Sequence, residues 1–232
     1  MHSVSATEKG GRPTMKDENN SPDAARRRSC YLAAGIAISA FSLLFLRLIP
    51  FFWIQLAVSV LVLCGLALVL ERKHMLAALR DAGGRNLIVD VALGLASASV
   101  LYVVFMVGNV AARILFPFGG SEIESVYGFG SATSRLAIGL LLLLVVGPGE
   151  EFFWRGYVQR RLASEFGLPG MALSVLAYGG AHVVTFNLTL ILAAFVCGGF
   201  WALMYHFFHS LRANMISHAA WAVAIFVLFP MA

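Results

Sequence analysis

Long apolar stretches, separated by short polar segments, dominate the chain. An α-helix needs roughly 20 apolar residues to cross the hydrocarbon core of a bilayer. Seven stretches come close to that length or exceed it, at residues 31–49, 51–70, 87–116, 134–160, 168–184, 186–208 and 213–229. The pattern predicts an all-α fold, a polytopic transmembrane bundle of about seven helices that forms one domain.

Composition supports a membrane protein and separates the amino-terminal segment from the rest. Of the 232 residues, 59% are hydrophobic and 12% are charged, and the mean hydropathy is +0.82. Soluble globular domains carry about twice that share of charged residues. Residues 1–28 differ, because they are polar and have no apolar period. We therefore expect a disordered cytosolic tail at 1–28, followed by a transmembrane domain at 29–232.

Lysine and arginine indicate the orientation in the membrane, because short cytoplasmic loops carry the positive excess. If seven helices alternate, the basic residues share one side, at 26–28, 72–85, 160–161 and 212. The connection at 119–133 on the other side has two glutamates and no basic residue. We expect a multi-pass protein of a bacterial inner (plasma) membrane with a cytoplasmic amino terminus. The net charge of +5 then reflects membrane anchoring, and no nucleic-acid partner is expected.

Two adjacent glutamates and an arginine interrupt the fourth apolar stretch. Charged side chains at the centre of a bilayer cost at least ~2.5 to 3.5 kcal/mol, so Glu150, Glu151 and Arg155 are candidate functional residues. On a helix, Glu151 and Arg155 share a face at i, i+4, while Glu150 is turned about 140° away from Arg155. We expect Arg155 to neutralise Glu151 and to leave Glu150 for a water or a histidine. A purely structural ion pair with a spectator carboxylate is the alternative.

Two histidines lie in later apolar stretches. His182 is near the end of the fifth, and His218 is in the seventh, with Asn214 one turn before it. At ~1.5 Å per residue, Glu150, His182 and His218 lie roughly 15, 21 and 9 Å from the cytosolic ends of their helices, so they can converge if a helix tilts or kinks. The Gly-Pro-Gly sequence at 147–149 is expected to provide a kink that opens the bundle to water.

The sequence from Glu150 to Arg155 fits the pattern EExxxR. With His182 and His218 following in separate apolar stretches, it resembles the CPBP family, the CAAX-protease and bacteriocin-processing (Abi) group, over residues 135–230. The resemblance implies an intramembrane glutamic endopeptidase that hydrolyses a peptide bond of a membrane-associated protein or peptide. It implies no cofactor.

The resemblance also implies a role for each residue. Glu150 would be the general base, and His182 would share the proton of the same water. Glu151 and Arg155 would brace the site, and His218 would donate to the oxyanion.

Two positions depart from the family's pattern. Tyr178 stands where the second motif, FxxxH, usually has phenylalanine, and Ala222 stands where the third motif, HxxxN, has asparagine. Asn214, four residues before His218, lies on the same helical face and could supply the missing oxyanion donor.

Other functions remain open. A zinc peptidase could use Glu150, Glu151, His182 and His218 as ligands, but HExxH is absent and adjacent helical glutamates cannot both face one ion without distortion. A proton-coupled transporter could use the same residues, although the chain shows no internal repeat. A non-catalytic relative acting in immunity, or as a membrane interaction protein, would tolerate Glu150→Ala. In every case the lipid bilayer is a partner.

Overall fold

The computed structural model describes residues 22–47, 50–80, 86–128 and 133–231, and in these residues it contains helices and no strand. The elements are α2 (Pro22–Phe45), α3 (Phe52–Arg80), α4 (Leu87–Leu115), α5 (Gly119–Tyr127), α6 (Arg135–Leu141), η2 (Leu142–Val146), α7 (Gly147–Glu151), η3 (Phe152–Gln159), α8 (Arg160–Phe166), α9 (Leu168–Gly180), η4 (Val183–Thr185), α10 (Leu188–Phe208), α11 (Leu211–Val223) and η5 (Ala224–Leu228). The segments α6 to α8 follow one another without a break and form one long helix.

In the described part of the chain, seven helical segments are long and apolar enough to cross a membrane. They are Ala24–Phe45, Phe52–Arg80, Leu87–Leu115, Arg135–Phe166, Leu168–Thr185, Leu188–Phe208 and Leu211–Leu228. Each overlaps one of the predicted stretches, which confirms the all-α class and the transmembrane bundle. The chain is an integral, multi-pass membrane protein. The sequence did not predict α5, a short helix in the connection after α4.

The first helix starts earlier than the predicted end of the tail. α2 begins at Pro22, so residues 22–28 are helical and not part of a tail. Alanine and arginine, which make up residues 24–28, are among the strongest helix formers, and they extend the helix beyond its apolar part. Residues 1–21 lie outside the described part of the chain, and a disordered tail there remains a prediction.

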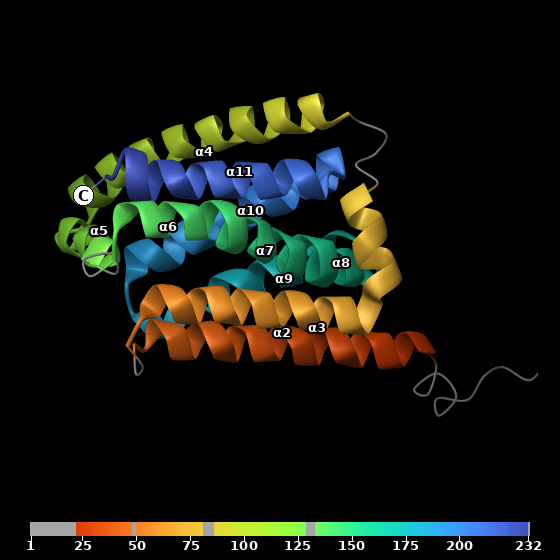
Figure 1. Cartoon of the computed structure of the whole chain (residues 1–232). Coiled ribbons are helices and arrows are strands. Elements are labelled where there is room, and N and C mark those ends of the chain that lie inside the picture. The colour runs from red at the N-terminus through yellow and green to blue at the C-terminus, as the bar shows by residue number, and fades with distance from the viewer. Residues whose placement is uncertain (1–21, 48–49, 81–85, 129–132, 232) are drawn as a thin grey trace, which may run out of the picture.

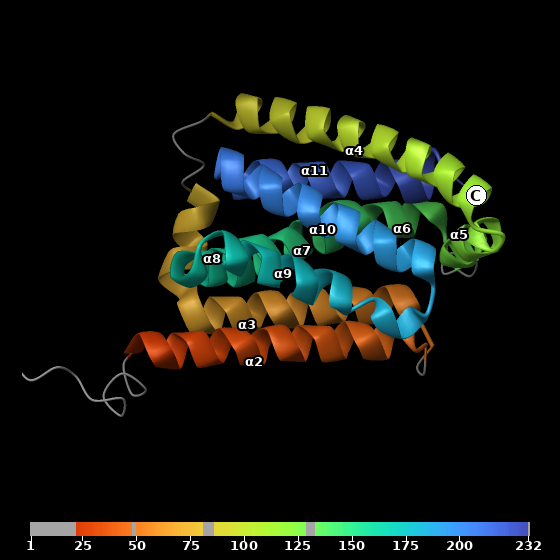
Figure 2. The same cartoon turned by 180° about the vertical axis from the view of Figure 1, so that it is seen from behind.

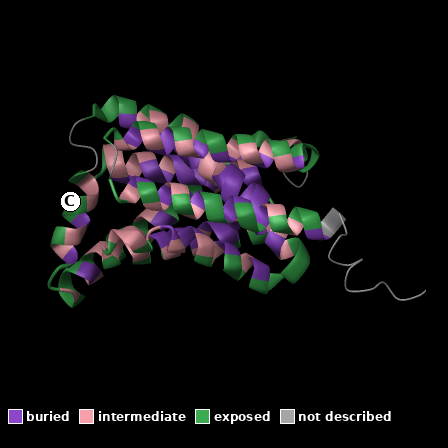
Figure 3. Ribbon diagram, turned by 90° about the horizontal axis from the view of Figure 1, so that it is seen from below, coloured by how far each residue is buried: buried purple, intermediate pink, exposed green. Residues whose placement is uncertain are grey.

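The long helix α6–α8 lies in the middle of the bundle. Figures 1 and 2 show α4 and α11 on one side of it and α2 and α3 on the other, while α9 and α10 cover it from behind. α11 packs against both α4 and α7, and α9 packs against α8, η3 and α10. The buried residues gather where these helices face one another, and exposed residues lie on the outside (Figure 3).

The third helix changes direction at a buried carboxylate. Glu71 has non-helical dihedral angles, φ −141° and ψ 45°, in the middle of α3. Its side chain forms an ion pair with Arg160 and lies 4.0 Å from Arg161, both on α8. Beyond Glu71, α3 crosses the end of the bundle instead of continuing along it (Figure 1).

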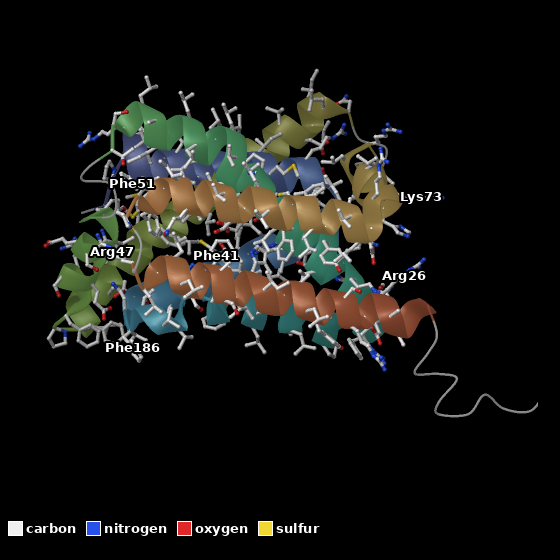
Figure 4. The ribbon with its side chains drawn as sticks, turned by 60° about the horizontal axis from the view of Figure 1, so that its bottom comes forward. Arg26, Phe41, Arg47, Phe51, Lys73 and Phe186 are labelled. Carbon is white, nitrogen blue, oxygen red and sulfur yellow. The ribbon has the colours of Figure 1, made fainter. Side chains whose placement is uncertain are left out.

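The two ends of the bundle differ in their side chains. Arg26 and Lys73 lie at one end, and Arg47, Phe51 and Phe186 lie at the other (Figure 4). Arg26 and Lys73 therefore share an end, as the alternation of the spans predicts.

Candidate functional site

The glutamate-bearing helix widens on both sides of the glutamates. Five residues before α7 and eight after it, η2 and η3, form π-helix. Val146, Gly147, Glu151 and Phe152, which bound α7, all have right-handed helical dihedral angles. The helix therefore continues through Pro148, and it is flanked by two π-helical stretches, a feature that is frequent at functional sites.

The glycines on either side of Pro148 allow close packing of α7. A Cβ atom on Gly147 would lie 2.7 Å from the backbone N and Cα of Ala219 on α11. A Cβ atom on Gly149 would lie 2.3 Å from Cγ1 of Val60 on α3. Only glycine fits at both positions without a shift, so these residues bring the glutamates close to α11 and α3.

Glu151 is the centre of a buried group of polar side chains. It has no exposed surface, and its Oε1 accepts hydrogen bonds from Nη1 of Arg155 at 3.0 Å and from Nδ1 of His218 at 2.9 Å. Its Oε2 accepts from Nδ2 of Asn214 at 3.1 Å. The ion pair with Arg155 is the one that the helical spacing predicts. The bonds to His218 and Asn214 were not expected from the sequence.

Arg155 is buried, and it has partners besides Glu151. Its Nη2 donates to the carbonyl oxygen of Gly198 on α10 at 3.0 Å. Its guanidinium carbon lies 4.8 Å from the centre of the Tyr178 ring and 5.6 Å from that of Trp201. A buried charge is tolerated when it is paired and hydrogen-bonded, and both conditions are met here.

His218 is held from two directions. Its Nδ1 bonds Glu151, and its ring stacks on Trp201 with centroids 3.8 Å apart and planes inclined by 15°. Nε1 of Trp201 donates to Oγ of Ser217 at 3.1 Å, which secures the indole in turn. The imidazole therefore has a fixed orientation, with Nε2 as the nitrogen that remains for chemistry.

Asn214 does not have the geometry of an oxyanion donor. Its Nδ2 donates both to Glu151 and, at 2.9 Å, to the carbonyl oxygen of Trp201. An amide nitrogen has two hydrogens, and both already have acceptors. Asn214 thus holds Glu151, and the expectation that it replaces the asparagine missing at Ala222 is not supported. The sequence could not show these partners of Asn214, because they depend on how α11 packs against α7 and α10.

Glu150 belongs to a second, more accessible group. Its side chain is half-buried, and its Oε2 accepts a hydrogen bond from the hydroxyl of Tyr178 at 3.1 Å. Nδ1 of His182, also half-buried, lies 3.2 Å from the carbonyl oxygen of Tyr178. A carbonyl oxygen can only accept, so Nδ1 carries the proton and Nε2 of the neutral ring is an acceptor.

The two groups adjoin each other. Glu150 and Glu151 are consecutive, and the guanidinium of Arg155 faces the Tyr178 ring. The site thus combines an enclosed ionic cluster with a carboxylate and an imidazole that retain exposed surface. Both of these side chains carry atoms that can accept a hydrogen bond.

Residues 132–224 match the Rce1-like family model, described as type II CAAX prenyl endopeptidase Rce1-like. This segment is therefore similar to the CPBP family. No curated protein and no solved structure matches the chain. Members of the CPBP family are generally hydrolases of the CAAX-protease type.

The matched segment, residues 132–224, contains all six predicted site residues, and the structure distributes them over the two groups. Glu150 and His182 contact Tyr178, while Arg155, Asn214 and His218 contact Glu151.

Sequence reasoning did not find every residue of the site. The sequence showed Tyr178 only as a tyrosine in place of the phenylalanine of the second motif, and it did not show which group accepts a hydrogen bond from the hydroxyl. Trp201 carried no signal, because a tryptophan in an apolar span usually packs against other helices or lies at the membrane interface. Among the described residues, no group of three or more His, Cys, Asp or Glu side chains converges as metal ligands would.

Proposed function

We propose that the protein is an intramembrane endopeptidase that cleaves a membrane-associated protein or peptide with a water activated by Glu150 and His182. The supporting observation is the division of the polar residues in the site. Glu151 is enclosed by Arg155 and His218, whereas Glu150, the next residue, retains exposed surface. The similarity of residues 132–224 to the Rce1-like family model supports the same class of reaction.

The hydrogen-bond pattern indicates how a water would be held. The Tyr178 hydroxyl occupies Oε2 of Glu150, which leaves Oε1 to accept one hydrogen of the water. Nε2 of His182 accepts the other hydrogen. The water oxygen attacks the scissile carbonyl carbon as its proton passes to Glu150. Glu150 then returns this proton to the leaving nitrogen as the C–N bond breaks, which yields a carboxylic acid and an amine.

His218 is the donor for the oxyanion in this proposal. Its Nδ1 donates to Glu151, so Nε2 can also donate only if the ring is an imidazolium. Glu151 then lies between two cations, Arg155 and His218. A preformed donor of this kind contributes about 2.7 to 4 kcal/mol to stabilisation of the transition state.

We place the amino terminus in the cytoplasm. The support is the position of Arg26 and Lys73 at one end of the bundle, together with the positive-inside rule. The substrate would reach the site from the bilayer, because the site residues lie within apolar spans.

The test is cleavage of membrane-anchored peptides by the purified protein in lipid vesicles. Two probes are compared, a farnesylated peptide ending in a CAAX sequence and an unmodified peptide with an apolar transmembrane anchor. Glu150→Gln and His182→Ala should each reduce kcat by at least about 10²-fold. Glu124→Gln is the matched control, because Glu124 is an exposed glutamate on α5 outside the site.

The outcomes separate the mechanisms. Cleavage that survives Glu150→Gln would refute the glutamic mechanism. Loss of cleavage on chelation with recovery on adding zinc would favour a metallopeptidase. If the wild-type protein cleaves neither probe, a non-catalytic relative becomes the better explanation.

A further inference from the structure

We infer that Tyr178 is a positioning residue that orients both members of the water-activating pair, an inference that rests on the proposed function. Its side chain contacts Glu150, and its main chain contacts His182. Through these two contacts, one residue links the proposed base, Glu150, to its partner, His182. In this chain the aromatic position of the second motif therefore has a polar role.

The contact with His182 depends on how α9 ends. The backbone N–H of His182 bonds the carbonyl oxygen of Gly179 at 3.0 Å, a tighter i to i−3 bond than the α-helical one. The Tyr178 carbonyl oxygen is thereby open to the imidazole, whose Nδ1 lies 3.2 Å from it. This bond selects the tautomer of His182 that has its acceptor at Nε2.

The contact with Glu150 depends on how the Tyr178 ring is packed. The ring is 7% exposed, and it meets Trp154 edge-on with centroids 5.5 Å apart. Arg155 covers one face at 4.8 Å. On α10, a Cβ atom on Gly198 would lie 3.0 Å from Cδ1 of Tyr178, so glycine leaves just enough room for the ring. The surrounding side chains therefore determine where the hydroxyl lies.

The chemical consequence is a carboxylate with a defined orientation. The hydroxyl binds Oε2 of Glu150 and leaves Oε1 for the water. A phenylalanine at 178 would keep the ring packing but would no longer hold the carboxylate, which could then rotate away from the water. The expected loss is in the reaction step and not in substrate binding.

Tyr178→Phe in the full-length protein tests the inference. We expect kcat for the cleaved probe to fall about tenfold with KM unchanged, since hydrogen bonds to charged groups contribute of that order. Tyr157→Phe is the matched control. Tyr157 is fully buried on η3, and its hydroxyl has no hydrogen-bond partner among the described residues. The kcat of the Tyr157→Phe variant should stay within twofold of the wild-type value.

Infrared spectroscopy gives a readout that does not need activity. The carboxylate bands of Glu150 are assigned as those that disappear in Glu150→Gln. They should shift in Tyr178→Phe and stay in place in Tyr157→Phe.

The two proposals can fail separately. If Glu150→Gln abolishes cleavage while Tyr178→Phe changes neither kcat nor the bands, the role of Tyr178 is refuted and the proposed function stands. If Glu150→Gln leaves cleavage intact, the proposed function is refuted, and with it the role of Tyr178 in water activation. An unshifted band would then also refute the contact itself. Equal losses of kcat in both tyrosine variants would indicate a general packing effect and refute the positioning role.

Discussion

Gly147→Ala tests the packing that creates the site. A Cβ atom at this position would lie 2.7 Å from both N and Cα of Ala219 and 3.1 Å from its Cβ. Non-bonded carbon atoms prefer separations of ~3.5 to 4.0 Å. Backbone atoms cannot rotate away from the new methyl group, so α7 and α11 must move apart by roughly 0.8 Å or more.

Gly147→Ala should reduce both the stability and the activity of the protein. Overpacking of this kind destabilises by about 1 to 3 kcal/mol, and the better helix propensity of alanine returns up to about 1 kcal/mol. We expect a net loss near 1 to 2 kcal/mol. Activity should fall further, because the 2.9 Å bond between Glu151 and His218 joins the same two helices. A shift of about 1 Å at a catalytic site can reduce the rate about 10²-fold.

The assay combines thermal unfolding in detergent with cleavage of the anchored peptide. Gly139→Ala is the control on the same long helix, since its Cβ atom would meet Val227 at an ordinary 3.7 Å. That variant should be as stable as the wild type or more stable, with unchanged activity. Wild-type stability and activity in Gly147→Ala would show that α7 and α11 are not in close backbone contact at this position.

Two further predictions concern ionic contacts outside the site. Partial burial raises the pKa of Glu122, but hydrogen bonds from the side chain and backbone of Thr189 and from the backbone of Leu188 outweigh it and lower the pKa below 4.5. This contribution to stability is complete above the unfolded pKa and is lost as the pH falls through the lower folded pKa. Glu122→Gln should therefore reduce the acid dependence of the melting temperature below about pH 4, and an unchanged profile would contradict the contact. Fully buried Asp90 accepts from Nε of Arg212 at 2.8 Å, so Asp90→Asn should lower the free energy of unfolding by about 1 to 3 kcal/mol. Arg212→Gln should cost less stability in that variant than in the wild type, and strictly additive losses in chemical unfolding would argue against the pairing.

Features that depend on local sequence were predictable. Seven spans follow from the length and hydropathy of each stretch, and each of these is a property of that stretch alone. The pair of Glu151 and Arg155 was predictable as well, because its geometry is internal to one helix. The order of EExxxR, His182 and His218 along the chain was sufficient by itself to indicate the family.

Features that depend on contacts between helices could not be predicted from the sequence. The break in α3 occurs at Glu71, whose partner Arg160 is 89 residues away. The start of α2 and the short helix α5 lay outside the strong apolar signal. The π-helical stretches were not predicted either, because the prediction assumed 3.6 residues per turn throughout.

The sequence by itself determined the membrane class, the spans and the list of charged and polar residues that had to be explained within them. Only the tertiary structure decided the partner of each. His218 and Asn214 bind Glu151, and Tyr178 links Glu150 to His182. The physical reason is that a hydrogen bond between helices requires a particular rotation and separation of both. These are determined by close contacts such as those at Gly147 and Gly149, which no single segment encodes.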